Sequence, residues 1–144
     1  MKTEESIVIN RPVEDVWKFM TDWSNYLKFG PDLLELNQIS SGPLGIGTTL
    51  KMSSKSTGET VLRIVEYEPN RKFTWEYSSG RFKGAIFTRS METIDGKTRL
   101  TDTLNAKLSG IYRLLGSFVA SRVRKSFTEQ LGSVKRLLES EARD

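Results

Sequence analysis

The sequence predicts an α+β domain in which an antiparallel sheet packs against one long C-terminal helix. Strand and turn signals fill residues 33–108, and apolar residues then recur at three- and four-residue steps over the last third of the chain. A hairpin-rich sheet with its helices on one face is the α+β arrangement. The chain has 144 residues, so we expect a single domain over 1–144 with a substantial buried core.

The first elements expected are one strand and two short helices. Residues 6–9 are apolar and β-branched, which is typical of a strand. Pro12 suits the first turn of a helix, where its missing N–H costs nothing, and residues 13, 16, 17 and 20 then form one apolar helical face. Asp22 can cap a second short helix, which Gly30-Pro31 ends.

Six further strands and one continuous helix are expected after this. The strands cover residues 34–39, 48–52, 60–67, 72–77, 82–94 and 97–108. The helix runs from about Tyr112 to Ala142, with an unbroken apolar stripe from Leu114 to Leu138. A helix of this length must lie across something large, and the sheet is the candidate.

The dipeptide Asp95-Gly96 predicts a hairpin and fixes its register, because Ile94 then faces Lys97. One face of this hairpin carries the apolar pairs Ala85–Ala106, Phe87–Leu104 and Met91–Leu100. On the same face Arg89 lies opposite Asp102. Buried charges are costly unless paired and hydrogen-bonded. The pair is therefore either a polar anchor for a ligand or an internal ion pair without a ligand role.

The turn at Ser79-Gly80 leaves one register open. A two-residue loop there would put Phe73, Trp75 and Tyr77 on the face opposite Phe87, although both sets are apolar and suit the interior. Either the loop has an odd number of residues, or a bulge, most naturally at Gly84, shifts the strand.

Several motifs together resemble the START-like superfamily, also called SRPBCC or Bet v 1-like. They are INRPVEDVW at 9–17, TDW at 21–23, GPLGIGT at 42–48, VEYEPNR at 65–71 and DGKTRLT at 95–101. The resemblance covers essentially the whole chain and is strongest to the polyketide cyclase/dehydrase and lipid-transport branch. It implies a helix-grip fold of order β-α-α-β6-α. In that fold a seven-stranded antiparallel sheet curves around the long helix and encloses a cavity for an apolar ligand.

The expected cavity wall combines this implied fold with the hairpin register and the aromatic strand. The candidate ligand-binding residues are Phe73, Trp75, Tyr77, Phe87, Arg89, Met91, Asp102, Leu104, Phe118 and Arg122. No residue is assigned a catalytic role, and neither a cofactor nor a metal is expected.

Composition excludes several other classes of function. The sequence has no histidine and no cysteine, which removes Ser-His-Asp and Cys-His nucleophiles, structural zinc sites and disulfides. A net charge of +4 is too small for a nucleic-acid footprint. The basic residues of the last helix read as a solvated face, so we expect at most transient membrane contact. The acidic N-terminus does not suit a signal peptide, and a soluble cytoplasmic protein is expected.

Three functions remain open at this point. The favoured one is binding or carriage of a small hydrophobic molecule. The alternative is a cyclase or dehydratase, in which Arg89 holds a carbonyl or enolate oxygen and Asp102, Glu66 or Tyr77 moves protons. The third is a protein-interaction module with a filled core, whereas a cavity above ~300 Å³ favours the first two. The sequence does not predict the oligomeric state.

Overall fold

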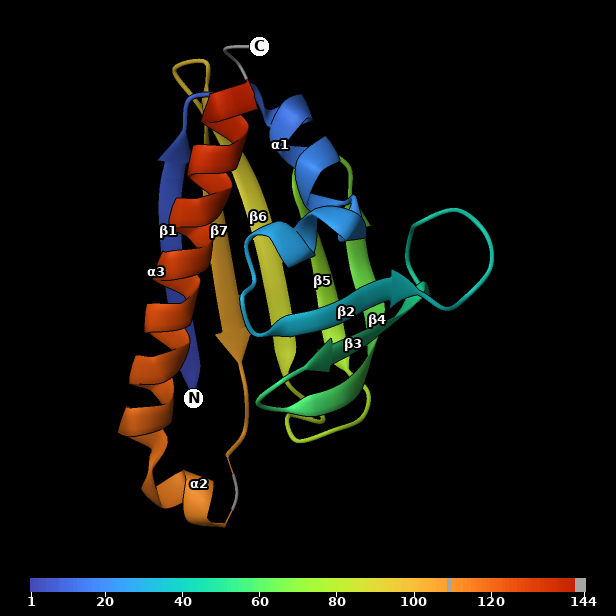
Figure 1. The fold of residues 1–144 in the computed structure, drawn as a ribbon, viewed down its shortest axis with the longest axis vertical. Coiled ribbons are helices and arrows are strands. Elements are labelled where there is room, and N and C mark those ends of the chain that lie inside the picture. The colour runs from blue at the N-terminus through green and yellow to red at the C-terminus, as the bar shows by residue number, and fades with distance from the viewer. Residues whose placement is uncertain (109, 142–144) are drawn as a thin grey trace.

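The computed structural model describes residues 1–108 and 110–141, and these residues build a curved antiparallel sheet against one long helix, α3 (Gly116–Glu141) (Figure 1). Within this part of the chain the sheet has seven strands in the order β1-β7-β6-β5-β4-β3-β2. The strands are β1 (Lys2–Ile9), β2 (Leu33–Gln38), β3 (Thr49–Ser54), β4 (Gly58–Glu68), β5 (Lys72–Tyr77), β6 (Ile86–Ile94) and β7 (Lys97–Asn105). The predicted α+β, helix-grip architecture is confirmed.

Two short helices connect β1 to β2 and cover part of the concave face of the sheet. The first is α1 (Val13–Met20), and Pro12 precedes it as the N-cap residue rather than lying in its first turn. The second is a 3₁₀-helix, η1 (Trp23–Lys28). Asp22 caps η1 as predicted, since its carboxylate accepts a hydrogen bond from the Ser24 N–H at 3.1 Å.

The β6–β7 hairpin has the register predicted from Asp95-Gly96. Ile94 pairs with Lys97, and Arg89 lies opposite Asp102. Both turn residues have positive φ, 51° at Asp95 and 76° at Gly96, which is the backbone that a two-residue hairpin turn requires. The strands are shorter than expected at their far ends, because β6 begins at Ile86 and β7 ends at Asn105.

Residues 78–84 form a longer loop than a two-residue turn, and this resolves the open register. Trp75 pairs with Phe87, and the Tyr77 N–H donates to the Ala85 carbonyl at 2.9 Å. The seven-residue loop is odd in length, so Trp75 comes to the same face as Phe87 and no bulge is needed. Gly84 instead supplies a left-handed residue to the loop, with φ 90°.

The prediction of one continuous final helix is wrong at its start. A separate turn of helix, α2 (Ile111–Leu114), comes first, and α3 begins at Gly116. The apolar stripe is buried at Leu131, Val134 and Leu138, whereas Leu114 is 86% exposed. The reason is geometric: α2 lies beyond the ends of β1 and β7, where no strand is available to cover it (Figure 1).

The core occupies the space between the concave face of the sheet, the two N-terminal helices and the C-terminal half of α3. An aromatic cluster fills its centre, where the Trp23 ring contacts Tyr26, Phe73 and Trp75 at centroid distances of 5.5–6.2 Å. None of the described helices is both long and apolar enough to cross a membrane.

Candidate functional site

A buried ion pair joins the neighbouring strands β6 and β7 on the concave face of the sheet. Arg89 Nε donates to Asp102 Oδ1 and Arg89 Nη2 donates to Asp102 Oδ2, each at 2.6 Å. Their side chains are 2% and 0% exposed. Parallel hydrogen bonds from the guanidinium fork to a carboxylate are the strongest geometry for such a pair, and the hairpin register makes this geometry possible.

Tyr26 completes the polar cluster from η1. Arg89 Nη1 donates to the Tyr26 hydroxyl at 2.9 Å, and that hydroxyl donates to the Met20 carbonyl at 2.7 Å. Burial, reinforced by the Asp102 carboxylate, raises the pKa of Tyr26 to about 12, although Arg89 opposes the rise. Burial also disfavours the Arg89 charge, but Asp102 and Tyr26 outweigh this and the pKa of Arg89 is raised. The cluster therefore holds one cation, one anion and one neutral phenol at neutral pH.

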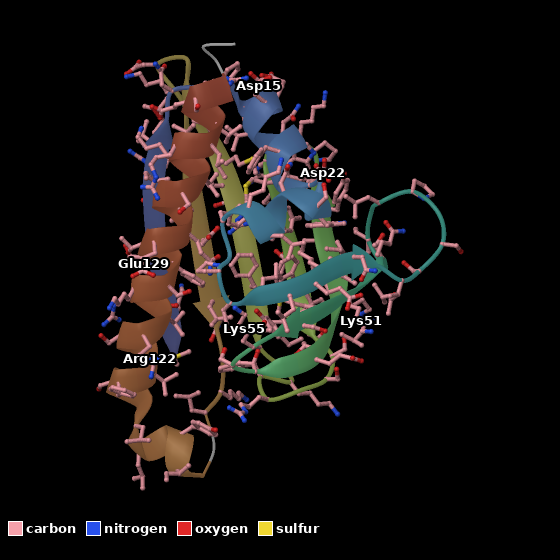
Figure 2. All side chains as sticks on the ribbon, viewed as in Figure 1. Asp15, Asp22, Lys51, Lys55, Arg122 and Glu129 are labelled. Carbon is pink, nitrogen blue, oxygen red and sulfur yellow. The ribbon has the colours of Figure 1, made fainter. Side chains whose placement is uncertain are left out.

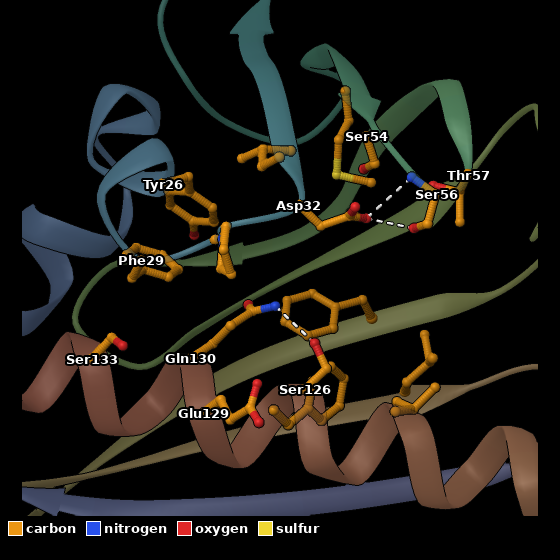
Figure 3. Close-up of a pocket in the computed structure, with 18 of the residues that line it drawn as sticks. Tyr26, Phe29, Asp32, Ser54, Ser56, Thr57, Ser126, Glu129, Gln130 and Ser133 are labelled. Atoms are coloured by element: carbon orange, nitrogen blue, oxygen red, sulfur yellow. Dashed lines mark hydrogen bonds between the residues drawn. The ribbon is translucent and has the colours of Figure 1, made fainter.

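This cluster borders a partly enclosed pocket of about 580 Å³ between α3 and the sheet. Buried side chains form its inner wall: Tyr26, Phe29, Trp75, Phe87, Arg89 and Leu104. Polar side chains form the outer edge, with Asp32 and Ser56 on one side and Ser126, Glu129 and Gln130 of α3 on the other (Figure 3). An apolar interior with a few convergent polar groups is the usual form of a small-molecule site.

Trp75 supplies a polar atom whose only polar neighbour among the described residues is not close enough, or not well enough aligned, for a full hydrogen bond. Its side chain is 4% exposed, and its indole Nε1–H has no hydrogen-bond partner among the described residues. The neighbouring Tyr77 also lines the pocket, and burial raises the pKa of its hydroxyl. The Trp75 indole N–H lies near that hydroxyl and partly opposes the rise, without the geometry of a full hydrogen bond. A buried donor without a partner costs free energy, and surrounding atoms cover this one, so an acceptor on a bound molecule would relieve the cost only after a small movement that opens the nitrogen to the pocket.

The structure brings half of the predicted ligand-binding residues to the pocket. Those that line it are Trp75, Tyr77, Phe87, Arg89 and Leu104. Three others are buried but lie elsewhere. Asp102 stands behind Arg89 in the ion pair, Phe73 packs against the rings of Trp17 and Trp23, and Met91 belongs to the apolar core.

Phe118 and Arg122 do not line the pocket, which corrects their assignment to its wall. Phe118 is 59% exposed, and the Arg122 guanidinium lies 5.7 Å from the centre of its ring. Arg122 comes from the lower part of α3, near α2 (Figure 2). A helical stripe predicts which residues share a face, but the extent of the sheet decides how much of that face is covered.

Sequence reasoning missed most of the residues that η1 and α3 contribute to the pocket. Phe29 of the segment after η1 and Phe127 of α3 both line it, and Phe127 packs edge-on against Phe87 at 5.9 Å. Phe127 belonged to the predicted apolar stripe, so the signal was present. Tyr26 comes from η1 and Phe29 directly follows it, and no local pattern predicts where this short helix lies over the sheet.

The remaining candidate for proton transfer lies on the outer face of the sheet. Glu66 pairs with Lys72 at 2.9 Å and accepts a hydrogen bond from Thr74, and its carboxyl does not line the pocket. These bonds lower the pKa of Glu66, the one from Lys72 most. Within residues 1–108 and 110–141, no group of three acidic side chains is close enough to hold a metal ion.

The comparisons with known proteins agree with this architecture. The family described as "polyketide cyclase / dehydrase and lipid transport" matches residues 1–139. No curated protein matches the sequence.

Solved structures of low sequence identity share the fold. TTHA0849 from Thermus thermophilus is 14% identical, with a TM-score of 0.81 over 98% of this chain and 99% of that chain. The Zhui aromatase/cyclase from Streptomyces sp. R1128 is 13% identical, with a TM-score of 0.77 over 99% and 95%. Ara h 8.0201 is 15% identical, with a TM-score of 0.72 over 97% and 98%. At these identities the likeness is one of fold.

Proposed function

The chain belongs to the polyketide cyclase/dehydrase and lipid-transport family, and on that premise we propose that it binds and carries a small, largely apolar molecule in the pocket under α3. The molecule carries at least one oxygen acceptor at its inner end. The observation that supports this most directly is the pocket itself, whose inner wall combines buried aromatic side chains with the Arg89 guanidinium, and the covered indole N–H of Trp75 is a second donor beside it. A pocket of about 580 Å³ has room for a molecule of drug-like size.

The ion pair has a supporting role in this proposal. Arg89 already donates to Asp102 and to Tyr26, so its fork is held rigidly at the inner wall. Its remaining N–H groups can reach an acceptor without moving the side chain. Asp102 compensates the charge of Arg89, but the N–H groups of the guanidinium that face away from Asp102 still favour a ligand end that bears partial negative charge.

The alternative, a cyclase or dehydratase, finds less support in the geometry. Of the groups considered for proton transfer, Glu66 lies on the outer face and Asp102 is held by Arg89. Tyr77 reaches the pocket, but its pKa is raised, which suits a neutral donor better than a base. A protein-interaction module with a filled core fits less well still, because the pocket exceeds the ~300 Å³ at which ligand pockets begin.

Native mass spectrometry of the purified protein tests for a co-purifying apolar molecule. Binding strength is tested with 1-anilinonaphthalene-8-sulfonate, an aromatic probe with sulfonate acceptors whose fluorescence rises in apolar sites. Trp75→Phe removes the indole N–H and keeps an aromatic ring, and we expect the probe to bind about tenfold more weakly. Trp17→Phe is the matched control, because Trp17 is also buried but packs against Tyr67 and Phe73 outside the pocket. Leu114→Ser controls for probe bound outside the pocket. Equal affinities in the Trp75→Phe variant and the wild type would overturn the assignment of Trp75.

A further inference from the structure

The start of the C-terminal helices exposes a cluster of large apolar side chains, which we call the α2 patch. Its members are Ile111, Tyr112, Leu114, Leu115 and Phe118, between 43% and 86% exposed. They are half of the ten large hydrophobic residues that are exposed in the described part of the chain. Single exposed apolar residues are ordinary, but five within eight positions mark a surface that meets something apolar.

The same segment holds the excess positive charge of the protein. Residues 103–128 contain five basic residues and no acidic one: Lys107, Arg113, Arg122, Arg124 and Lys125. All five are exposed. Taking these five from the 22 Lys and Arg leaves 17 against 18 Asp and Glu, so the rest of the chain is nearly neutral. The apolar patch and the excess positive charge therefore share one stretch of the chain, and Arg122 lies directly over Phe118 of the patch.

Apolar side chains interleaved with arginine and lysine are what an anionic lipid surface attracts. A second copy of this chain fits less well, because it would bring two sets of five cations together. The position of the patch also suits a flat surface. α2 forms one extremity of the molecule, beyond the ends of the neighbouring strands, so no other element stands in its way (Figure 1).

We propose that the α2 patch docks the protein reversibly on membranes that contain anionic lipids. Leu114 and Phe118 enter the headgroup region, and Arg113 and Arg122 pair with lipid phosphates. The Arg122 guanidinium already lies over the Phe118 ring, so one cation and one apolar anchor present a common surface. Docking is electrostatic in part, and high salt reverses it.

This docking would place the pocket close to the lipid surface. Val123 and Phe127 of α3 line the pocket, and Val123 follows Phe118 by about 7.5 Å along the helix axis. The patch and the pocket wall are thus successive stretches of one helix. A carried molecule could pass between bilayer and pocket over a short path.

The test is flotation of the purified protein with vesicles of phosphatidylcholine, with and without phosphatidylglycerol. We expect the wild type to float with the anionic vesicles only, and to be released at high salt. Leu114→Ser with Phe118→Ser, and separately Arg113→Glu with Arg122→Glu, should each lower the partition coefficient about tenfold or more.

Matched controls change the same chemistry elsewhere. Ile39→Ser with Ile46→Ser alters residues that are 53% and 73% exposed, and Lys18→Glu with Lys55→Glu alters exposed cations outside the segment. Both should keep wild-type flotation. Trp75→Phe should keep it as well, which separates docking from ligand binding.

Three results would overturn the proposal. They are a wild type that does not float with anionic vesicles, control pairs that lose binding as far as the patch variants do, and dimers in sedimentation equilibrium that Leu114→Ser disperses. The last result would assign the α2 patch to a second copy of the chain.

Discussion

The buried cluster of Arg89, Asp102 and Tyr26 shows how one position depends on others far away in the chain. Arg89 and Asp102 could be paired from the sequence, because a two-residue hairpin leaves no freedom in the register. The contact of Tyr26 with Arg89 could not be predicted from the sequence, since Tyr26 lies 63 residues from Arg89 and reaches it only through the packing of η1 on the sheet. The local chemistry of a site is thus predictable where backbone pairing fixes it, and much less so where tertiary packing does.

Arg89→Met tests the energetics of the pair. The change keeps approximate bulk but leaves the Asp102 carboxylate buried without its cation, and we expect a loss of about 3–5 kcal/mol in the free energy of unfolding. The double variant with Asp102→Leu removes both charges and should recover most of that loss. Urea unfolding at neutral pH measures both. A double variant no more stable than the single one would show that the charge left behind is not what destabilises the protein.

Tyr26 predicts a dependence of stability on alkaline pH. Its pKa rises from 10.0 to about 12 on folding, so the unfolded state loses the proton first as the pH increases. The contribution is fully present below about pH 10 and is lost as the pH rises toward 12, with about 1 kcal/mol gone by pH 11. The Tyr26→Phe variant has no hydroxyl to ionise at this position. Its unfolding free energy should fall less steeply than that of the wild type between pH 9 and 11, and parallel curves would contradict the shift.

Among the elements, a turn whose residues favour one backbone conformation could be predicted from the sequence. How far the sheet covers the C-terminal helices could not. Asp95-Gly96 fixed its hairpin because both residues tolerate positive φ. The loop at 78–84 has no comparable signal, and its odd length emerges only from the pairing of Trp75 with Phe87. The final helix was predicted from its apolar period, but a period does not state where the opposing sheet ends.

A pair of identical substitutions tests which part of the C-terminal stripe is packed. Leu138 is 1% exposed and Leu114 is 86% exposed, although both belong to the same apolar period. Leu138→Ala should lower the free energy of unfolding by about 2–5 kcal/mol. Leu114→Ala should change it by less than about 0.5 kcal/mol. Denaturant melts compare the two, and similar losses would mean that the start of the helical region is packed in solution.

At the scale of the whole molecule, α3 is tightly packed on one edge of the sheet, whereas a pocket separates it from the other edge. The C-terminal half of α3 lies against β1 and buries Leu131, Val134 and Leu138. The strands β2 and β3 form the far edge of the sheet (Figure 1). They lie across the pocket from α3, so open volume rather than packed side chains separates them from this part of the helix. Elements with few packed neighbours open most easily, so a bound molecule should stabilise them most.

Hydrogen exchange measured by mass spectrometry, with and without saturating 1-anilinonaphthalene-8-sulfonate, tests this division. A ligand that binds only the folded state stabilises it by mass action, and the effect is largest where it supplies missing contacts. We expect slower exchange in the pocket-lining turns of α3, around Val123 to Ser133, and in β2 and β3. The centre of the β6–β7 hairpin, already held by the Arg89–Asp102 pair, should change little. Slower exchange confined to α2 would instead place the probe on the α2 patch. Uniformly slower exchange would mean that the protein opens as one cooperative unit rather than at the wall of its pocket.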